Sequence, residues 1–204
     1  MEEVFSVREI SGLIDNECPV IFDLGANCGF FTFLAHDFFP QAEIHSFEPQ
    51  RSLVSKFQRT LDRNKLKSEI TVNQCAVGKA SGEMEFFENR SPISASLIKE
   101  KVSSRTIRKK YKVRVTDLDS YAKENSISMV DILKIDVEGS EMEVVAGGKK
   151  VLDQAKVVFV EVHPPFCNAE EIEFALKKHG LHRSIRFERD QSKDQDLVFT
   201  RHLR

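Results

Sequence analysis

An apolar run that ends in a glycine-containing turn constrains the fold of this chain more than any other feature. In VIFDLGANCGFFT, residues 20–32, the apolar run ends on Asp23, the loop contains Gly25 and Gly29, and aromatic residues resume directly afterwards. This pattern predicts a buried strand, a tight turn and a helix. Such a unit often binds a ligand, which would be a dinucleotide, a phosphate or another small cofactor; alternatively, it is a tight turn that binds nothing.

Strand-like and helix-like segments alternate along the rest of the chain. We expect strands within 43–49, 69–78, 111–116, 130–139 and 155–165, and helices within 29–39, 51–65, 117–125, from about 141 onward, and within 169–180. This alternation predicts an α/β fold whose mostly parallel sheet carries helices on both faces. Residues 182–188 and 194–200 are expected to close the sheet as an antiparallel pair, and 82–89 to extend a sheet edge. Two helix starts are also predicted, by a capping box of Ser140 with Glu143 and by Asn168 with Glu171.

The chain is expected to form a single domain over residues 1–204, because this length suits one hydrophobic core and no linker divides it. Residues 1–17 predict a short helical lead-in. Residues 89–111 mix Ser, Pro and basic residues without a period, which indicates an irregular insertion or lid. Its basic side chains attract an anionic acceptor or simply form a solvated strand edge; they are Arg105, Arg108, Lys109, Lys110 and Lys112.

Composition excludes several classes of protein. The formal net charge of −2 gives no sign of nucleic-acid binding, and no apolar run has the length of a membrane span or a signal peptide. The four cysteines are far apart and form no CxxC pair, so free thiols in a reducing compartment fit better than disulfides. We therefore expect a cytoplasmic protein.

The glycine loop does not match the phosphate-binding patterns. Asn27 replaces a glycine of G-x-G-x-x-G, and no Gly-Lys pair follows Gly29. The carboxylate of Asp23 would also repel a pyrophosphate. S-adenosylmethionine fits better, because it carries an ammonium, a sulfonium and a ribose but no phosphate. Glu48, at the end of the second predicted strand, can accept hydrogen bonds from the ribose hydroxyls, although NAD sites place a carboxylate at the same point.

Five stretches together resemble the FkbM family of class I S-adenosylmethionine-dependent methyltransferases: DLGANCGFFT, SFEP, NQCAVG, VTDLDS and LKIDVEGSE. The resemblance spans about residues 20–165 and implies a Rossmann-like seven-stranded sheet with a C-terminal antiparallel hairpin. It also implies that the loop after the first strand holds the methionine end of the cofactor, Glu48 the ribose, and Ala76 and Val77 the adenine. The full predicted cofactor set is Asp23, Gly25, Ala26, Asn27, Gly29, Thr32, Glu48, Pro49, Ala76, Val77 and Asp136.

Polar residues at two further strand ends are candidates for the chemistry. Asp136 and Glu138 follow one predicted strand, and Glu161 and His163 lie on one side of the end of the next. His163 is the favoured general base for a hydroxyl acceptor, with Glu161 or Asp136 next. Alternatively, Asp136, Glu138 and Glu161 hold Mg²⁺ or Mn²⁺, or His163 is an ordinary loop histidine.

The favoured function is O-methylation of a hydroxyl on a sugar, glycan or small metabolite. The resemblance supplies this acceptor class, whereas the residues supply only the cofactor site and an acidic pocket. N-methylation of RNA or protein is the alternative within enzymes, although DVEG stands where an (N/D)-P-P-(Y/F) motif would be expected. A non-catalytic S-adenosylmethionine-binding module is the alternative outside enzymes. Because no large cap segment is evident, the pocket is open or is completed by a second subunit in a homodimer.

Overall fold

The computed structural model describes residues 8, 10–66, 69–89, 97, 107–188 and 194–201, with only the backbone described at 89 and 185–188. Its strands are β1 (Val20–Leu24), β2 (Glu43–Phe47), β3 (Ile70–Asn73), β4 (Ala76–Val77), β5 (Gly82–Asn89), β6 (Ile107–Thr116), β7 (Ile132–Ile135), β8 (Val157–Val162), β9 (His182–Glu188) and β10 (Gln195–Thr200). Its helices are α2 (Phe30–Phe38), α3 (Arg51–Asn64), α4 (Leu118–Glu124), α5 (Glu141–Gly147), α6 (Lys149–Leu152) and α7 (Ala169–Lys177).

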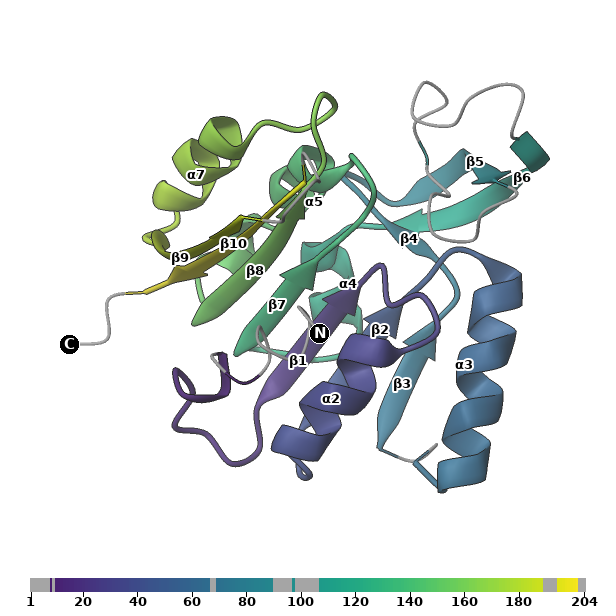
Figure 1. The fold of residues 1–204 in the computed structure, drawn as a ribbon, viewed down its shortest axis with the longest axis horizontal. Coiled ribbons are helices and arrows are strands. Elements are labelled where there is room, and N and C mark those ends of the chain that lie inside the picture. Colours follow the sequence, from purple (N-terminus) through teal and green to yellow (C-terminus); the bar gives the residue numbers. More distant parts are fainter. Residues whose placement is uncertain are drawn as a thin grey trace.

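The main sheet has seven strands in the order β3-β2-β1-β7-β8-β10-β9 (Figure 1). The five strands from β3 to β8 run parallel, and β10 is antiparallel to both β8 and β9. The predicted Rossmann-like sheet with a C-terminal antiparallel hairpin is therefore confirmed. The chain order reverses beside β1, so the carboxyl ends of β1, β2 and β7 meet where this class of sheet binds ligands.

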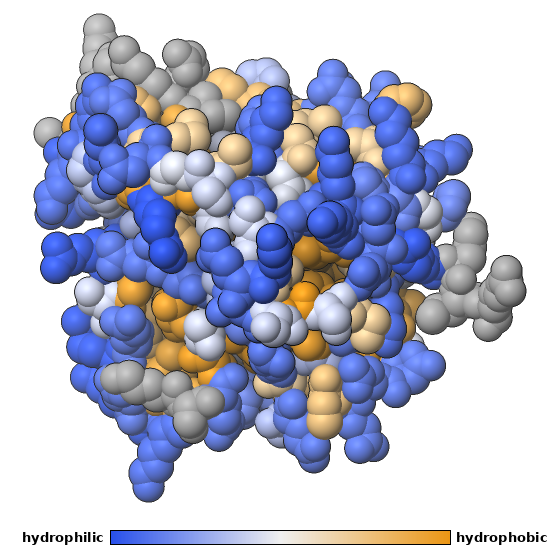
Figure 2. Space-filling view, turned by 180° about the vertical axis from the view of Figure 1, so that it is seen from behind, coloured by the Kyte–Doolittle hydropathy of each residue, from blue (hydrophilic) through white to orange (hydrophobic). Residues whose placement is uncertain are grey.

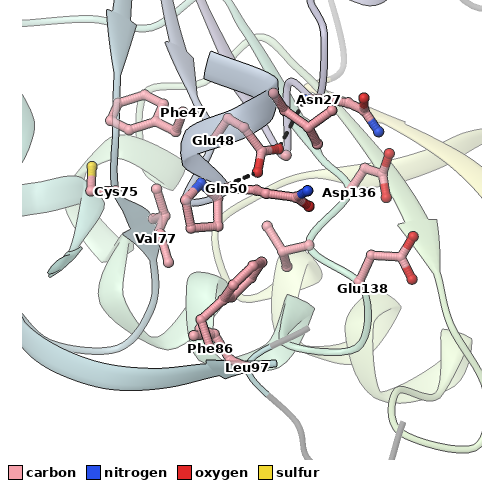
Figure 3. Close-up of a pocket in the computed structure, with 15 residues that line it drawn as sticks. Asn27, Phe47, Glu48, Gln50, Cys75, Val77, Phe86, Leu97, Asp136 and Glu138 are labelled. Atoms are coloured by element: carbon pink, nitrogen blue, oxygen red, sulfur yellow. Dashed lines mark hydrogen bonds between the residues drawn. The ribbon is translucent and has the colours of Figure 1, made fainter. Parts of the chain in front are cut away.

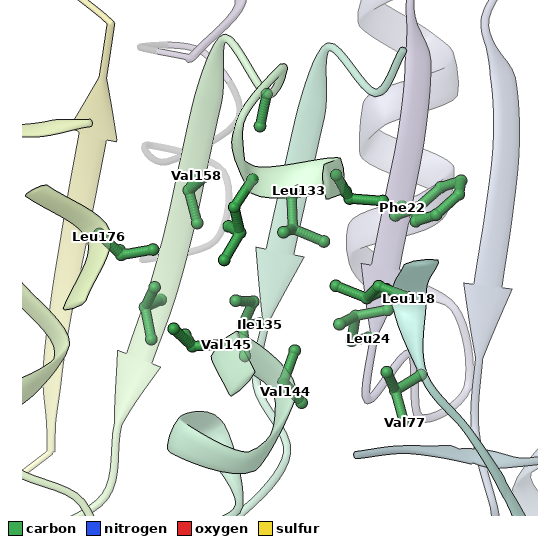
Figure 4. Close-up of a cluster of buried hydrophobic side chains, with 14 of the residues drawn as sticks. Phe22, Leu24, Val77, Leu118, Leu133, Ile135, Val144, Val145, Val158 and Leu176 are labelled. Atoms are coloured by element: carbon green, nitrogen blue, oxygen red, sulfur yellow. The ribbon is translucent and has the colours of Figure 1, made fainter. Parts of the chain in front are cut away.

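Two apolar cores cover the two faces of the sheet. One lies under α2 and α3, and the other lies under α4, α5, α6 and α7 (Figures 1 and 4). Neighbouring residues of β1 divide between the cores, since Ile21 belongs to the first and Phe22 to the second. This alternation is the period of two that a strand requires, and burial on both faces explains why the strands read as continuous apolar runs.

A second, three-stranded sheet of order β4-β6-β5 corrects two expectations. Residues 69–78 form two short strands in different sheets, because the chain turns at Gln74 and Cys75 between β3 and β4. Strand β6 begins at Ile107, so residues 107–111 are not part of an irregular insertion but pair with β5 in antiparallel register. The remainder of 89–106, except for the described residues 89 and 97, lies outside the described ranges.

The basic side chains of β6 face acidic partners on β5. Lys110 lies 2.7 Å from Glu85, Lys112 lies 3.5 Å from Glu83, and the Arg108 guanidinium lies 3.8 Å from the Glu88 carboxylate. Opposite charges across antiparallel strands stabilise the pairing. The ordinary charged-edge interpretation therefore accounts for these three residues, while Arg105 lies outside the described ranges.

The two predicted helix caps have different outcomes. The Asn168 side chain accepts a hydrogen bond from the Glu170 backbone N–H at 2.8 Å, so it caps α7 as expected. Ser140 precedes α5 but makes no side-chain cap, which corrects the predicted capping box. Glu141 instead accepts the Gly139 N–H at 2.8 Å. The start of α5 is therefore fixed by a glutamate whose carboxylate turns back toward the preceding loop.

The N-terminal segment packs against the α2–α3 face. Residues 8, 10 and 11 are helical, and the side chains of Ile10 and Ile14 are buried in that core. Among the helices of the described ranges, none combines the length and apolar character that a bilayer crossing requires. The face opposite to that of Figure 1 is mainly hydrophilic, with hydrophobic atoms in recesses between polar side chains (Figure 2).

Candidate cofactor and methyl-transfer site

The glycine loop is folded tightly onto the end of β7. Gly25, Asn27 and Gly29 all have positive φ, at 75°, 53° and 95°. The backbone N–H groups of Gly25 and Ala26 both donate to the Phe47 carbonyl at 2.9 Å. A Cβ atom on Gly25 would lie 1.7 Å from the Asp136 carbonyl oxygen. Only glycine permits this approach, which brings the loop after β1 against the loop after β7.

Glu48 is held at the carboxyl end of β2 by two backbone groups. Its carboxylate accepts the Asn27 N–H at 3.0 Å and the Gln50 N–H at 2.7 Å, and its side chain is buried. Burial raises the pKa of Glu48 to about 7, although the two backbone hydrogen bonds act in the opposite direction. The carboxylate thus sits at a fixed place beside the glycine loop and changes charge near neutral pH.

One pocket joins most of the predicted cofactor residues (Figure 3). The predicted residues that line it are Gly25, Asn27, Glu48, Pro49, Ala76, Val77, Asp136 and Glu138. Residues that the sequence analysis missed also line it, namely Phe47, Gln50, Leu53, Cys75, Phe86, Leu97 and Val137. The apolar members gather on one side and the carboxylates on the other, as a ligand with an aromatic base and a polar tail requires.

The lining residues that were not predicted differ in whether a sequence pattern could have indicated them. Phe47 and Leu53 belong to apolar patterns that indicate core residues. The sequence therefore could not distinguish residues that line the pocket from ordinary core residues. Phe86 lies on β5 and reaches the pocket only because β5 pairs within the second sheet. Gln50 directly follows Glu48 and Pro49, so its proximity to the predicted ribose carboxylate was the one available signal.

Asp23 and Thr32 lie beneath the loop and not among the pocket-lining residues. Both side chains are fully buried, and the Thr32 hydroxyl donates to Asp23 at 2.6 Å. The Lys134 ammonium lies 3.3 Å from the other oxygen of Asp23. Ala26 and Gly29 are likewise outside the lining set. In this structure these residues are part of the glycine loop or pack against it, and they do not face the pocket.

Lys134 connects the loop to the end of β7. Its Nζ lies 3.2 Å from an Asp136 carboxylate oxygen and donates to the Gly25 carbonyl at 3.3 Å. The side chain is only 3% exposed, and Lys134 is the register partner of Asp23 on the adjacent parallel strand. Burial raises the pKa of Asp136, while the Lys134 charge acts in the opposite direction. Lys134 is thus a buried cation shared by two carboxylates.

The four predicted chemical residues come together after β7 and β8. His163 Nε2 lies 3.4 Å from Glu161 and 3.8 Å from both Asp136 and Glu138. On the other side of the ring, Nδ1 lies 2.8 Å from Glu141, whose side chain is fully buried. Glu141 is not among the predicted site residues, because its place in the sequence indicates the start of a helix. The contact with Glu141 thus orients the imidazole so that Nε2 faces the three other carboxylates.

A family model described as "Methyltransferase FkbM domain" matches residues 23–186. The chain belongs to the FkbM methyltransferase family. Membership makes it an S-adenosylmethionine-dependent methyltransferase with the fold described above. The expected family resemblance is therefore confirmed.

Two relatives whose names state an activity are similar to this chain over most of its length. The 31-O-demethyl-FK506 methyltransferase FkbM of Streptomyces tacrolimicus is 28% identical over 189 residues, which cover 79% of this chain and 72% of the relative. The hexuronic acid methyltransferase AglP of Haloferax volcanii is 24% identical over 172 residues, which cover 80% of this chain and 67% of the relative.

A solved structure shares the fold. The methyltransferase FkbM from Methylobacillus flagellatus KT superimposes with a TM-score of 0.66 and 16% identity over 93% of this chain. This chain corresponds to 45% of the length of that protein. The likeness supports the architecture of the sheet.

Proposed function

We propose that this FkbM-family chain transfers a methyl group from S-adenosylmethionine to a hydroxyl oxygen of a sugar, glycan or small metabolite. The observation that carries the proposal is the fixed imidazole of His163. Glu141 holds its Nδ1 at 2.8 Å, and Nε2 faces Asp136, which also lines the pocket beside Glu48. A proton acceptor therefore adjoins the pocket in which the cofactor would lie.

The pocket residues suit the parts of this cofactor. Glu48 can accept hydrogen bonds from the ribose hydroxyls, and Pro49, Ala76, Val77 and Phe86 form an apolar place for the adenine. The methionine end would lie against the loop at Gly25 and Asn27, toward Asp136. Asp23 and Thr32 support this loop from below and would act on the cofactor through it.

Methyl transfer requires alignment and a place for one proton. When bound, S-adenosylmethionine supplies an electrophilic methyl group, which the acceptor oxygen takes in line as the C–S bond breaks. The hydroxyl proton passes to His163 Nε2, while the Nδ1–H is donated to Glu141. The carboxylates of Asp136, Glu138 and Glu161 stabilise the imidazolium that forms. These side chains thus bind and orient the acceptor and remove its proton.

Oxygen is favoured over nitrogen as the methyl acceptor by the relatives and by the loop after β7. The Streptomyces relative is named for a 31-O position and the Haloferax relative for a hexuronic acid. The sequence after β7 is DVEG, which lacks the paired prolines of the amine-directed motif. N-methylation of RNA or protein and a non-catalytic cofactor-binding role remain the alternatives that an experiment must separate.

Calorimetry and a labelled-methyl screen test the proposal together. Wild-type protein is expected to bind S-adenosylmethionine and S-adenosylhomocysteine, and to transfer labelled methyl to an alkali-stable ether on a hydroxylated acceptor. Binding without transfer to any hydroxyl, amine, RNA or protein would favour the non-catalytic role. Transfer to amines alone would favour N-methylation. Folded protein that binds neither ligand would contradict the cofactor assignment itself.

Substitution of His163 by alanine or of Asp136 by asparagine is expected to lower turnover by roughly a hundredfold, because a positioned base contributes at least this much to proton removal. The affinity for S-adenosylhomocysteine should change little in His163→Ala, since His163 is not among the lining residues. Single-turnover rates and calorimetry measure the two quantities. Wild-type turnover in both variants would remove these residues from the mechanism.

A divalent cation is a second candidate for activating the acceptor. Asp136, Glu161 and His163 each offer one ligand atom, and these atoms lie within 4.8 Å of one another. Glu138, which the sequence analysis included as a ligand, is not in this group. Mixed carboxylate and imidazole donors suit Mn²⁺ or Mg²⁺, with Glu141 orienting the imidazole. A metal held there would lower the pKa of a bound hydroxyl.

Chelation distinguishes the two ways of activating the hydroxyl. If the imidazole acts as the base, turnover should persist after dialysis against a strong chelator, and added Mn²⁺ should not restore any loss. If a cation is required, turnover should fall to background and return with Mn²⁺ or Mg²⁺. Calorimetric titration of Mn²⁺ into the stripped protein, with Glu161→Gln as control, reports binding independently of activity.

The pKa of Glu48 predicts a pH dependence of cofactor binding. Ribose hydroxyls donate to the ionised carboxylate, and burial raises its pKa to about 7 in the empty protein. Affinity for S-adenosylhomocysteine should therefore be highest above this pH and fall about tenfold for each pH unit below it. Calorimetry across pH measures the slope. The Glu48→Gln variant should bind weakly with little slope, and a wild-type slope in that variant would assign the titration to another group.

A further inference from the structure

The Gln50 side chain occupies the middle of the cofactor pocket. In Figure 3 its amide extends between Glu48 and Asp136. The side chain is 3% exposed, and Gln50 precedes the first turn of α3, where its backbone N–H binds Glu48 at 2.7 Å. The backbone of Gln50 is thus held by the same carboxylate that the proposed function assigns to the ribose, and this places the Gln50 side chain beside that carboxylate.

The two ends of the amide have different partners. Nε2 donates to the Ser52 hydroxyl at 2.9 Å. Oε1 is buried and has no hydrogen-bond partner among the residues that the structure describes. A buried acceptor without a donor is unfavourable, so the empty pocket contains an oxygen that a ligand hydroxyl could satisfy. The amide does not cap α3, and its hydrogen bond to Ser52 involves Nε2 and leaves Oε1 available.

The space around the amide is too small for a nucleoside. The cavity that remains between the lining residues is about 70 Å³, whereas pockets for small ligands enclose roughly 300–1,000 Å³. A turn of the Gln50 amide would enlarge the part of this cavity that lies beside Glu48. The Gln50 side chain carries no charge and makes one hydrogen bond among the described residues, so its amide can turn at the loss of that bond alone.

We propose that Gln50 is a ribose ligand of this site, whose amide fills the pocket beside Glu48 when the pocket is empty and turns to accept a hydrogen bond from a ribose hydroxyl through Oε1 when the cofactor binds. This rests on the proposed S-adenosylmethionine function. The ribose is the expected partner because Gln50 adjoins Glu48 on the polar side of the pocket. The amide oxygen is a hydrogen-bond acceptor, and each hydroxyl of the ribose diol can donate a hydrogen bond to it.

A cycle of one variant and two analogues tests the proposal. S-adenosylhomocysteine, its 2′-deoxy analogue and its 3′-deoxy analogue are titrated calorimetrically into wild-type protein and into Gln50→Met, which keeps the length but removes the acceptor. For one of the analogues, the loss of affinity caused by deleting the hydroxyl should be about fivefold smaller in Gln50→Met than in wild type. Leu53→Met, at an apolar lining position, should show the wild-type penalties for both analogues.

Each other outcome is decisive. Equal penalties in wild type and Gln50→Met for both analogues would overturn the ribose role, while S-adenosylhomocysteine binding itself would leave the proposed function standing. Tighter binding in Gln50→Met with unchanged penalties would make Gln50 only a cover of the pocket and would also overturn it. Failure of folded wild type to bind S-adenosylhomocysteine would overturn both. Thermal unfolding checks the variant, and Gln50→Leu replaces it if Gln50→Met does not fold.

Discussion

Gly25→Ala is expected to destabilise the protein by about 2–5 kcal/mol and to leave it without measurable affinity for S-adenosylhomocysteine. Alanine resists the left-handed conformation at φ 75°, and its Cβ would lie 1.7 Å from the Asp136 carbonyl oxygen. The penalty combines the conformational cost, about 1–2 kcal/mol, with that of overpacking, about 1–3 kcal/mol. Because backbone atoms cannot turn aside as side chains do, the loops after β1 and β7 must separate. Urea unfolding and calorimetry measure the two losses.

Gly82→Ala is the matched control for this substitution. Gly82 begins β5, and a Cβ atom placed there would meet nothing within 4 Å. The free energy of unfolding should change by less than about 0.5 kcal/mol, as for other open surface positions. Cofactor affinity should remain at the wild-type value. If Gly25→Ala behaved like Gly82→Ala, the close contact between the two loops would not be a constraint on the site.

The main sheet was predictable because strands that are buried on both faces appear in the sequence as short apolar segments. In β1 and β8 the apolar residues alternate between the two cores, so both segments are almost entirely apolar, with Asp23 and Glu161 as the exceptions. The second sheet was not predictable in the same way. The break between Asn73 and Ala76 lies inside a segment of strand-like residues, and only the pairing of β4 with β6 shows that the chain has changed sheets.

The positions of candidate-site residues were predictable where a polar residue type and a strand end coincide. Glu48, Asp136, Glu161 and His163 satisfy this condition, and the structure brings them to one edge of the sheet. Burial direction was not available from the sequence. Asp23 also lies near the end of a strand. Its side chain nevertheless points toward the α2 face of the sheet, where it contacts Thr32 and Lys134.

The sequence contains an indication of the Lys134 ion pair that was not among the predictions. A lysine in the apolar segment ILKI, opposite an aspartate in the apolar segment VIFDL, indicates a cross-strand ion pair once the two strands are adjacent. Adjacency of β1 and β7 is a property of the topology and not of either segment. The pair therefore became visible only in the assembled sheet, where it lies below the cofactor loop.

Lys134→Met is expected to lower the free energy of unfolding by about 3–5 kcal/mol, because it leaves buried carboxylates without their counter-charge. The Lys134 Nζ lies 3.3 Å from Asp23 and 3.2 Å from Asp136, and it also donates to the Gly25 carbonyl. Loss of these contacts should also weaken cofactor binding, since the loop and the end of β7 lose their common anchor. Urea unfolding at neutral pH measures the stability.

Two further variants show that the charge at this place causes the loss. Lys112→Met removes an exposed lysine that lies 3.5 Å from Glu83, and it should cost no more than about 1 kcal/mol. Adding Asp23→Asn to Lys134→Met removes one of the stranded carboxylates, so the double variant should be more stable than the sum of the single effects by about 1–3 kcal/mol. Strict additivity would mean that Asp23 and Lys134 do not act as a pair, and the loss in Lys134→Met would then come from packing alone.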